Sequence, residues 1–123
     1  MVESVVTDGL LRALIVRHGF HEPGIHFVTP PDFAQQVGYM NHPAGHRIEP
    51  HTHLAVTRES RPTQEVLIIR KGRIRVNFYG DGTALQQSRT LEAGDLVLLS
   101  SGGHGFEVLE ACEMIEVKPG PFV

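Results

Sequence analysis

The sequence contains a single cysteine, Cys112, among its 123 residues. One cysteine cannot form an intramolecular disulfide, so a secreted scaffold held together by disulfides is excluded. Long hydrophobic runs are also scarce, because the apolar patch from Leu10 to Val16 is short and is interrupted by Arg12. We therefore expect neither a signal peptide nor a membrane span there, and we expect a cytoplasmic protein with no membrane partner.

The chain also has fewer basic than acidic residues. The chain has 11 Lys and Arg residues against 14 Asp and Glu residues, which gives a formal net charge of −3. Such a chain has no broad attraction for phosphate backbones, so we expect no nucleic-acid partner. The apolar share of 41% and the charged share of 20% are typical of a globular protein. The length predicts one domain over residues 1–123, with N-terminal strands in residues 1–44.

Glycine and proline recur along most of the chain and separate short runs rich in β-forming residues, a pattern that favours an all-β barrel or sandwich. We predict a tight hairpin at Arg70–Arg73 and a second turn at Gly80–Gly82. Strands are predicted at Val66–Ile69, Ile74–Phe78, Leu96–Leu99 and Met114–Val117. The core is expected to include Leu67, Ile69, Val76, Phe78, Leu98 and Val117.

Three other segments are less regular. Leu10–Val16 fits either a buried strand or one face of a helix, and we predict a strand. Phe33–Met40 resembles a strand, and alternation allows either Gln36 or Tyr39 to point inward. The polar stretch Thr57–Thr63 is expected to be an exposed loop.

Eight histidines are present, and two of them, His51 and His53, are separated by one residue. Side chains at positions i and i+2 of a strand share a face, so one metal ion could bind both imidazoles. Further ligands must come from neighbouring strands. Glu65 offers a carboxylate and His104 offers a third imidazole, which together would make a shell of three histidines and one carboxylate.

The order of these residues resembles the first motif of the cupin superfamily. That motif runs glycine, five residues, His-x-His, a gap, glutamate, six residues and glycine. It is matched here by residues at both ends and at the three ligand positions, namely Gly45, His51, His53, Glu65 and Gly72. The gap between His53 and Glu65 is longer than the family usually has.

The second cupin motif also has a similar counterpart, at Gly94 to His104. It begins with Gly94 and Asp95, continues through an apolar strand and closes with a histidine after a glycine turn. Ser100 stands where the family usually has proline, and the turn is shorter. The resemblance covers the cupin motifs in residues 45–117 and is closest to small single-domain bacterial cupins.

The resemblance implies a double-stranded β-helix, which is a jelly-roll-like barrel, and a homodimer. It also implies a divalent transition metal, such as iron, zinc, nickel or manganese, held by His51, His53, Glu65 and His104. The expected function is an enzyme of oxygenase or isomerase type that acts on a small polar substrate. The alternative is a non-catalytic module that binds a sugar or an organic acid and is linked to surface-polysaccharide metabolism.

Each candidate also has a simpler interpretation. His51 and His53 could be polar residues of a metal-free pocket, His104 an exposed turn residue, and Glu65 a carboxylate facing solvent. If a strand runs unbroken from Arg47 to His53, Arg47 shares the face of the histidines and is a candidate substrate-binding residue. Tyr39 is the second substrate-binding candidate. The remaining histidines receive no role: His18, His21, His26, His42 and His46.

Overall fold

The protein is described by a computed structural model that places residues 1–47, 49–51 and 64–119. The chain divides into two compact units. We call residues Met1–Phe20 with Arg61–Val123 the sheet unit and residues His21–Ser60 the hairpin unit, and each is described by itself. The regular elements of the described residues are all β-strands, so the all-β prediction is confirmed. The division into one domain stays a prediction.

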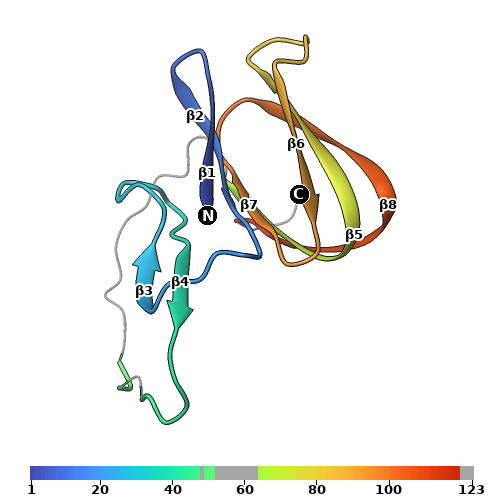
Figure 1. Cartoon of the computed structure of the whole chain (residues 1–123). Coiled ribbons are helices and arrows are strands. Elements are labelled where there is room, and N and C mark those ends of the chain that lie inside the picture. The colour runs from blue at the N-terminus through green and yellow to red at the C-terminus, as the bar shows by residue number, and fades with distance from the viewer. Residues whose placement is uncertain (48, 52–63, 120–123) are drawn as a thin grey trace. The chain divides into compact units, whose positions relative to one another are not determined.

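The sheet unit is a six-stranded antiparallel sheet that curls into a half-barrel (Figure 1). β5 is its central strand. The first part of β5 pairs with β7, the last part pairs with β6, and the opposite edge of β5 pairs with β8 along nearly its whole length. The strands are β1 (Val2–Thr7), β2 (Leu10–Val16), β5 (Glu65–Gly80), β6 (Gln87–Glu92), β7 (Leu96–Leu99) and β8 (Gly103–Val117).

Most of the predicted strands are confirmed. The four β-rich runs lie inside β5, β7 and β8, and the ambiguous segment Leu10–Val16 is the strand β2. The turn after β5 is also confirmed. Gly80 has a φ of 62°, and the backbone N–H of Gly82 donates to the Tyr79 carbonyl at 3.3 Å.

The predicted hairpin at Arg70–Arg73 is wrong, because β5 continues through it without a turn. Gly72 instead lies where the register between β5 and β8 shifts, as in a β-bulge. Its φ is 84°, and a Cβ added there would collide with the carbonyl oxygen of Ala111. A glycine between two apolar runs marks a bulge as readily as a turn, so the sequence pattern did not separate the two.

The core of the sheet unit is formed by inward-facing side chains of β1, β2, β5, β6 and β7. Burial of each valine, leucine, isoleucine or phenylalanine side chain contributes about 1.5–3 kcal/mol to folding. The buried cluster comprises Val5, Ala13, Ile15, Leu67, Ile69, Ile74, Val76, Phe78, Leu91, Val97 and Leu99. Four of the six predicted core residues belong to it. Leu98 is fully buried outside this cluster, whereas Val117 is 50% exposed.

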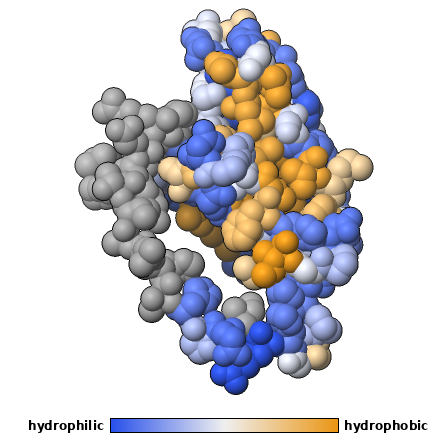
Figure 2. All heavy atoms as spheres, turned by 90° about the vertical axis from the view of Figure 1, so that its left-hand side faces the viewer, coloured by the Kyte–Doolittle hydropathy of each residue, from blue (hydrophilic) through white to orange (hydrophobic). Residues whose placement is uncertain are grey.

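The prediction for Val117 is wrong for a topological reason. β8 pairs only with β5 among the described strands, so few neighbours cover its apolar side chains. Hydrophobic residues also reach the surface seen in Figure 2, and in the sheet unit Val6 and Leu10 are among the exposed ones.

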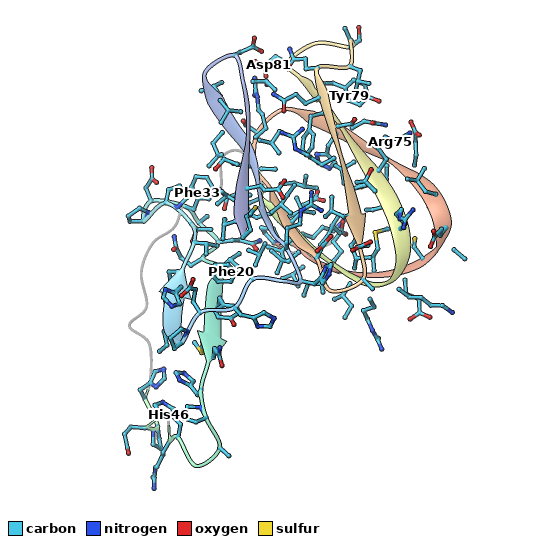
Figure 3. All side chains as sticks on the ribbon, in the orientation of Figure 1. Phe20, Phe33, His46, Arg75, Tyr79 and Asp81 are labelled. Carbon is cyan, nitrogen blue, oxygen red and sulfur yellow. The ribbon has the colours of Figure 1, made fainter. Side chains whose placement is uncertain are left out.

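Arg12 is a buried arginine that joins three turns of the sheet unit. Its side chain is 1% exposed, and its Nε donates to Thr7 Oγ1 at 2.8 Å. One Nη atom donates to Ser101 Oγ at 3.1 Å, and the other lies 3.5 Å from Asp8 and 3.6 Å from Asp81. Asp81 is at the turn between β5 and β6 (Figure 3). Arg12 therefore holds the β1–β2, β5–β6 and β7–β8 connections together.

Asp95 performs a similar role at the turn between β6 and β7. This side chain is buried, and it accepts hydrogen bonds from the backbone N–H groups of His18 and Glu92 and from Arg17. Burial alone would raise the pKa of Asp95, but these donors and the His18 ring hold its pKa below the ordinary value. Glu3 accepts from Arg17 at 2.6 Å, and this bond lowers the pKa of Glu3.

The hairpin unit contains two paired antiparallel strands, β3 (Gly24–Phe27) and β4 (Gly38–Asn41). Only the end of the strand-like run Phe33–Met40 is a strand, so that prediction is partly wrong. The Gln36 amide lies before β4 and donates to the carbonyls of Pro30 and Phe33 at 2.9 Å, which supports a loop. The predicted loop Thr57–Thr63 lies outside the described residues.

Candidate metal centre

Glu65 is the first residue of β5, directly opposite Leu99 of β7. Alternate residues of a strand share a face, so Glu65 is on the same face as Leu67 and Ile69, which belong to the buried core. The carboxylate of Glu65 therefore lies on the concave side of the sheet, at the margin of the core.

His104 is the second residue of β8 and pairs with Phe78 near the end of β5. Directly opposite residues of an antiparallel pair share a face, and Phe78 belongs to the core. The turn after Leu99 leads to Gly103, which is opposite Gly80. Because β5 is curled, this short connection bridges its two ends and brings His104 back toward Glu65.

The two side chains meet. His104 Nε2 lies 3.9 Å from Glu65 Oε2, and the side chains are 28% and 24% exposed. This distance is too long for a hydrogen bond. The bonds that zinc makes to an imidazole nitrogen and a carboxylate oxygen add up to about 4.1 Å, so one ion could contact both atoms. Partial exposure leaves room for water or a small molecule.

Apolar side chains continue from His104 along the same face of β8. Phe106 pairs with Val76, and Val108 pairs with Ile74. The rings of His104 and Phe106 are 5.7 Å apart between centroids and inclined at 56°. Phe106 is 39% exposed and Val108 is 60% exposed. A molecule bound near Glu65 and His104 would therefore meet an apolar surface on one side.

The opposite face of this strand pair carries charge. Arg75 of β5 donates to the Glu107 carboxylate at 2.9 Å, and Asn77 donates to the same carboxylate at 3.0 Å. Arg75 lies on the β5–β8 ribbon in Figure 3. The polar and apolar faces of β8 are thus distinct over this stretch, and Glu65 and His104 lie on the apolar face.

His51 lies in the hairpin unit and is exposed. Its Nδ1 is 2.9 Å from the carbonyl oxygen of Glu49, so this nitrogen carries the hydrogen and Nε2 would be the coordinating atom. The expected strand is absent at the described residues around it, in part because Pro50 has no backbone donor. His53 lies outside the described residues, so the predicted histidine pair stays a prediction.

The two predicted substrate-binding residues also belong to the hairpin unit. The Nε atom of Arg47 is 3.4 Å from Oε1 of Glu49, and both side chains are largely exposed. Tyr39 is on β4 opposite His26, and the centroids of the two rings are 6.3 Å apart. Their roles in substrate binding stay predictions.

Residues 1–47, 49–51 and 64–119 contain no group of three or more His, Cys, Asp or Glu side chains that could hold a metal ion. The structure therefore brings two of the four predicted ligands together, Glu65 and His104. It also partners His18, to which the sequence assigned no role, with Asp95 at 3.0 Å. The position of His18 soon after β2 gave no signal, because its partner lies on a distant turn.

Comparison with protein-family models, with curated proteins and with solved structures found no match for this chain. Among the described residues, no helix has the length and apolar character needed to cross a membrane.

Proposed function

We propose that the chain is a cupin with a double-stranded β-helix fold that binds one divalent transition metal and acts on a small polar molecule. The observation that carries the proposal is the 3.9 Å approach of Glu65 and His104 on the inner face of the half-barrel. These two residues come from the two separate motifs of the family pattern. If the resemblance arose by chance, there would be no reason for the ligand positions of the two motifs to lie close together in the structure.

The proposed ligand set adds His51 and His53 to this pair. Imidazole and carboxylate donors suit iron, zinc, nickel and manganese. A bound ion would polarise a substrate oxygen or activate water or dioxygen. In the chain itself, Arg47 would pair with an anionic group of the substrate and Tyr39 would offer a hydroxyl. These roles agree with an enzyme of oxygenase or isomerase type.

A metal titration of single variants tests the ligand set. We expect His104→Ala and Glu65→Gln each to weaken metal affinity by about tenfold or more, which corresponds to about 1.4 kcal/mol. His21→Ala is the matched control, because His21 is exposed and lies outside the proposed ligand set. Unchanged affinity in both site variants, with circular dichroism showing intact folds, would remove Glu65 and His104 from the shell.

Turnover assays then separate the enzyme from the alternative. Oxygen uptake by the iron-loaded protein, or isomerisation of a sugar or organic acid, would support catalysis. Saturable binding of such a molecule without conversion would instead indicate a non-catalytic module, of the kind we associated with surface-polysaccharide metabolism. That result would leave the proposed metal site unchanged, and only the proposed catalytic role would be replaced by ligand binding.

The family resemblance also leads us to propose that the protein is a homodimer. We further propose that it is located in the cytoplasm and that its binding partner is a small-molecule ligand. Light scattering across a range of protein concentrations tests the oligomeric state. A mass of one chain at every concentration would contradict the dimer.

A further inference from the structure

A second pair of potential metal ligands lies at the turn between β6 and β7. His18 follows the end of β2, and Glu92 is the last residue of β6. Nε2 of His18 is 3.7 Å from Oε1 of Glu92, and the two side chains are 52% and 51% exposed. An ion and its waters could therefore reach both atoms.

The other ring nitrogen of His18 is fixed by a buried carboxylate. Nδ1 lies 3.0 Å from Oδ1 of Asp95, whose side chain is 1% exposed. A carboxylate only accepts hydrogen bonds, so Nδ1 carries the hydrogen and the lone pair of the neutral ring is on Nε2. The same oxygen accepts the backbone N–H of His18 at 2.8 Å. A carboxylate that orients a histidine in this way is typical of metal-ligating histidines.

The turn permits a close approach of His18. Gly94 has a φ of 90°, and a Cβ added there would lie only 2.7 Å from the Cβ of His18. A side chain at this position would therefore push His18 away. Gly94 stands directly before Asp95, so one turn supplies both the space for His18 and the carboxylate that orients its ring.

Charged groups from several elements surround this pair. Arg17 pairs with Glu3 at 2.6 Å and with Asp95 at 3.1 Å, and Arg89 lies 3.9 Å from Glu3. The guanidinium groups of Arg17 and Arg89 therefore balance the carboxylates of Glu3 and Asp95. Glu92 adds a third carboxylate, and Arg73 lies opposite it on β5 and pairs with Glu110 at 3.5 Å. The 3.7 Å gap between His18 and Glu92 exceeds hydrogen-bond length. It is shorter than two metal–ligand bonds, which together span about 4.1 Å.

We propose that His18 and Glu92 form a second binding site for a divalent transition-metal ion, completed by water and oriented by Asp95. Asp95 is a positioning residue in this site, because it contacts the ring of His18 and not the ion. With only two protein ligands, the site would bind metal more weakly than the proposed four-ligand centre that includes Glu65 and His104. It does not depend on the proposed function, since His18, Glu92 and Asp95 are not among the residues proposed for that function.

Zinc titration followed by NMR of the histidine ring nitrogens tests this site. The experiment uses ¹⁵N-labelled protein carrying His104→Ala and Glu65→Gln, so that the candidate centre does not dominate the response. We expect zinc to shift the Nε2 resonance of His18 while Nδ1 stays protonated. Absence of any His18 shift up to about 1 mM zinc, a concentration that populates even weak sites, would overturn the proposal.

Measurements of zinc affinity in variants are the second test of this site. In the same background, His18→Ala and Glu92→Gln should each lower zinc affinity by about tenfold or more, and Asp95→Asn should lower it by about 10–100-fold. Glu113→Gln is the control, because Glu113 is exposed and lies on β8, which pairs with neither β6 nor β7 among the described strands. Equal affinity in the His18, Glu92 and control variants would overturn the site. The NMR arm retains the native Asp95 and so does not depend on the stability of Asp95→Asn.

Discussion

Glu65 at the start of β5 and His104 at the start of β8 place a carboxylate and an imidazole 3.9 Å apart on the inner face of a curled sheet. The relationship arises from the curvature of β5. Leu99 pairs with the first residue of β5 and Gly103 pairs with the last, so a short turn connects both ends of the strand. The candidate centre therefore depends on the sheet being bent as much as on the two residues.

The bulge at Gly72 is one source of this bend, and we predict that Gly72→Ala is strongly destabilising. Alanine at a φ of 84° costs about 1–2 kcal/mol, and the collision with the backbone of Ala111 adds to that cost. Urea unfolding should therefore show a loss of about 2 kcal/mol or more in the free energy of unfolding.

Gly82→Ala is the matched control for this prediction. Gly82 has nothing near the position of an added Cβ, and its φ is not in the left-handed region. Its substitution should change stability by less than about 0.5 kcal/mol. If the two variants unfold at the same urea concentration, Gly72 does not occupy the constrained bulge described above.

Arg12 should be difficult to replace, even by lysine. Lysine carries its donors on a single nitrogen, so Arg12→Lys would lose either the hydrogen bond to Thr7 or the one to Ser101. The loss would occur in a buried environment, because the Arg12 side chain is only 1% exposed. A buried partner left without a hydrogen bond costs about 1–3 kcal/mol. Thermal unfolding of Arg12→Lys and of the exposed control Arg70→Lys would measure the difference. An equal change in melting temperature in both variants would mean that the hydrogen bonds of the buried Arg12 guanidinium group contribute nothing to stability.

The stability of the sheet unit should fall in acid. The pKa of Glu3 is held below its ordinary value of 4.5, chiefly by the hydrogen bond from Arg17, and that of Asp95 is held below 3.8. A carboxyl whose pKa is lower in the folded state stabilises the fold above its unfolded pKa, and this contribution disappears as pH falls through the folded value. The contribution of these two carboxylates to stability should thus decline below about pH 4.5.

Glu3→Gln gives the control for the acid effect. This variant should be less stable than the native chain at pH 7, and the difference between them should shrink as pH falls, because the native Glu3 becomes protonated. Denaturant unfolding at several pH values in the presence of a metal chelator measures both curves. A constant difference from pH 7 to pH 3 would contradict the role of the Glu3–Arg17 pair.

The strands were predictable because their signals are local. Ile74–Phe78 alternates apolar and polar residues, and Leu96–Leu99 is a short apolar run before a glycine turn, so neither needs tertiary information. Gly72 was misread because a bulge and a hairpin both call for a positive φ. Only the pairing of β8 with both halves of β5 distinguishes the two. Such pairing joins distant segments, so it cannot be predicted from the sequence of one segment alone.

The candidate site was predictable in its residue types and not in its geometry. The spacing of Glu65 and His104 within two motifs identified them, but their approach depends on the bend of β5. The exposure of Val117 likewise followed from the place of β8 in the sheet, which its apolar sequence did not reveal. The His18–Asp95 contact joins the end of β2 to the β6–β7 turn, and no local pattern relates these segments.

Metal content tests the central claim most directly. The protein should be purified without an affinity tag and with His18→Ala, so that neither a tag nor the second site contributes metal. Elemental analysis should then find about one divalent transition-metal ion per chain, and far less when His104→Ala and Glu65→Gln are added. A metal content near zero in the His18→Ala chain, unrestored by incubation with iron, zinc, nickel or manganese, would contradict the account.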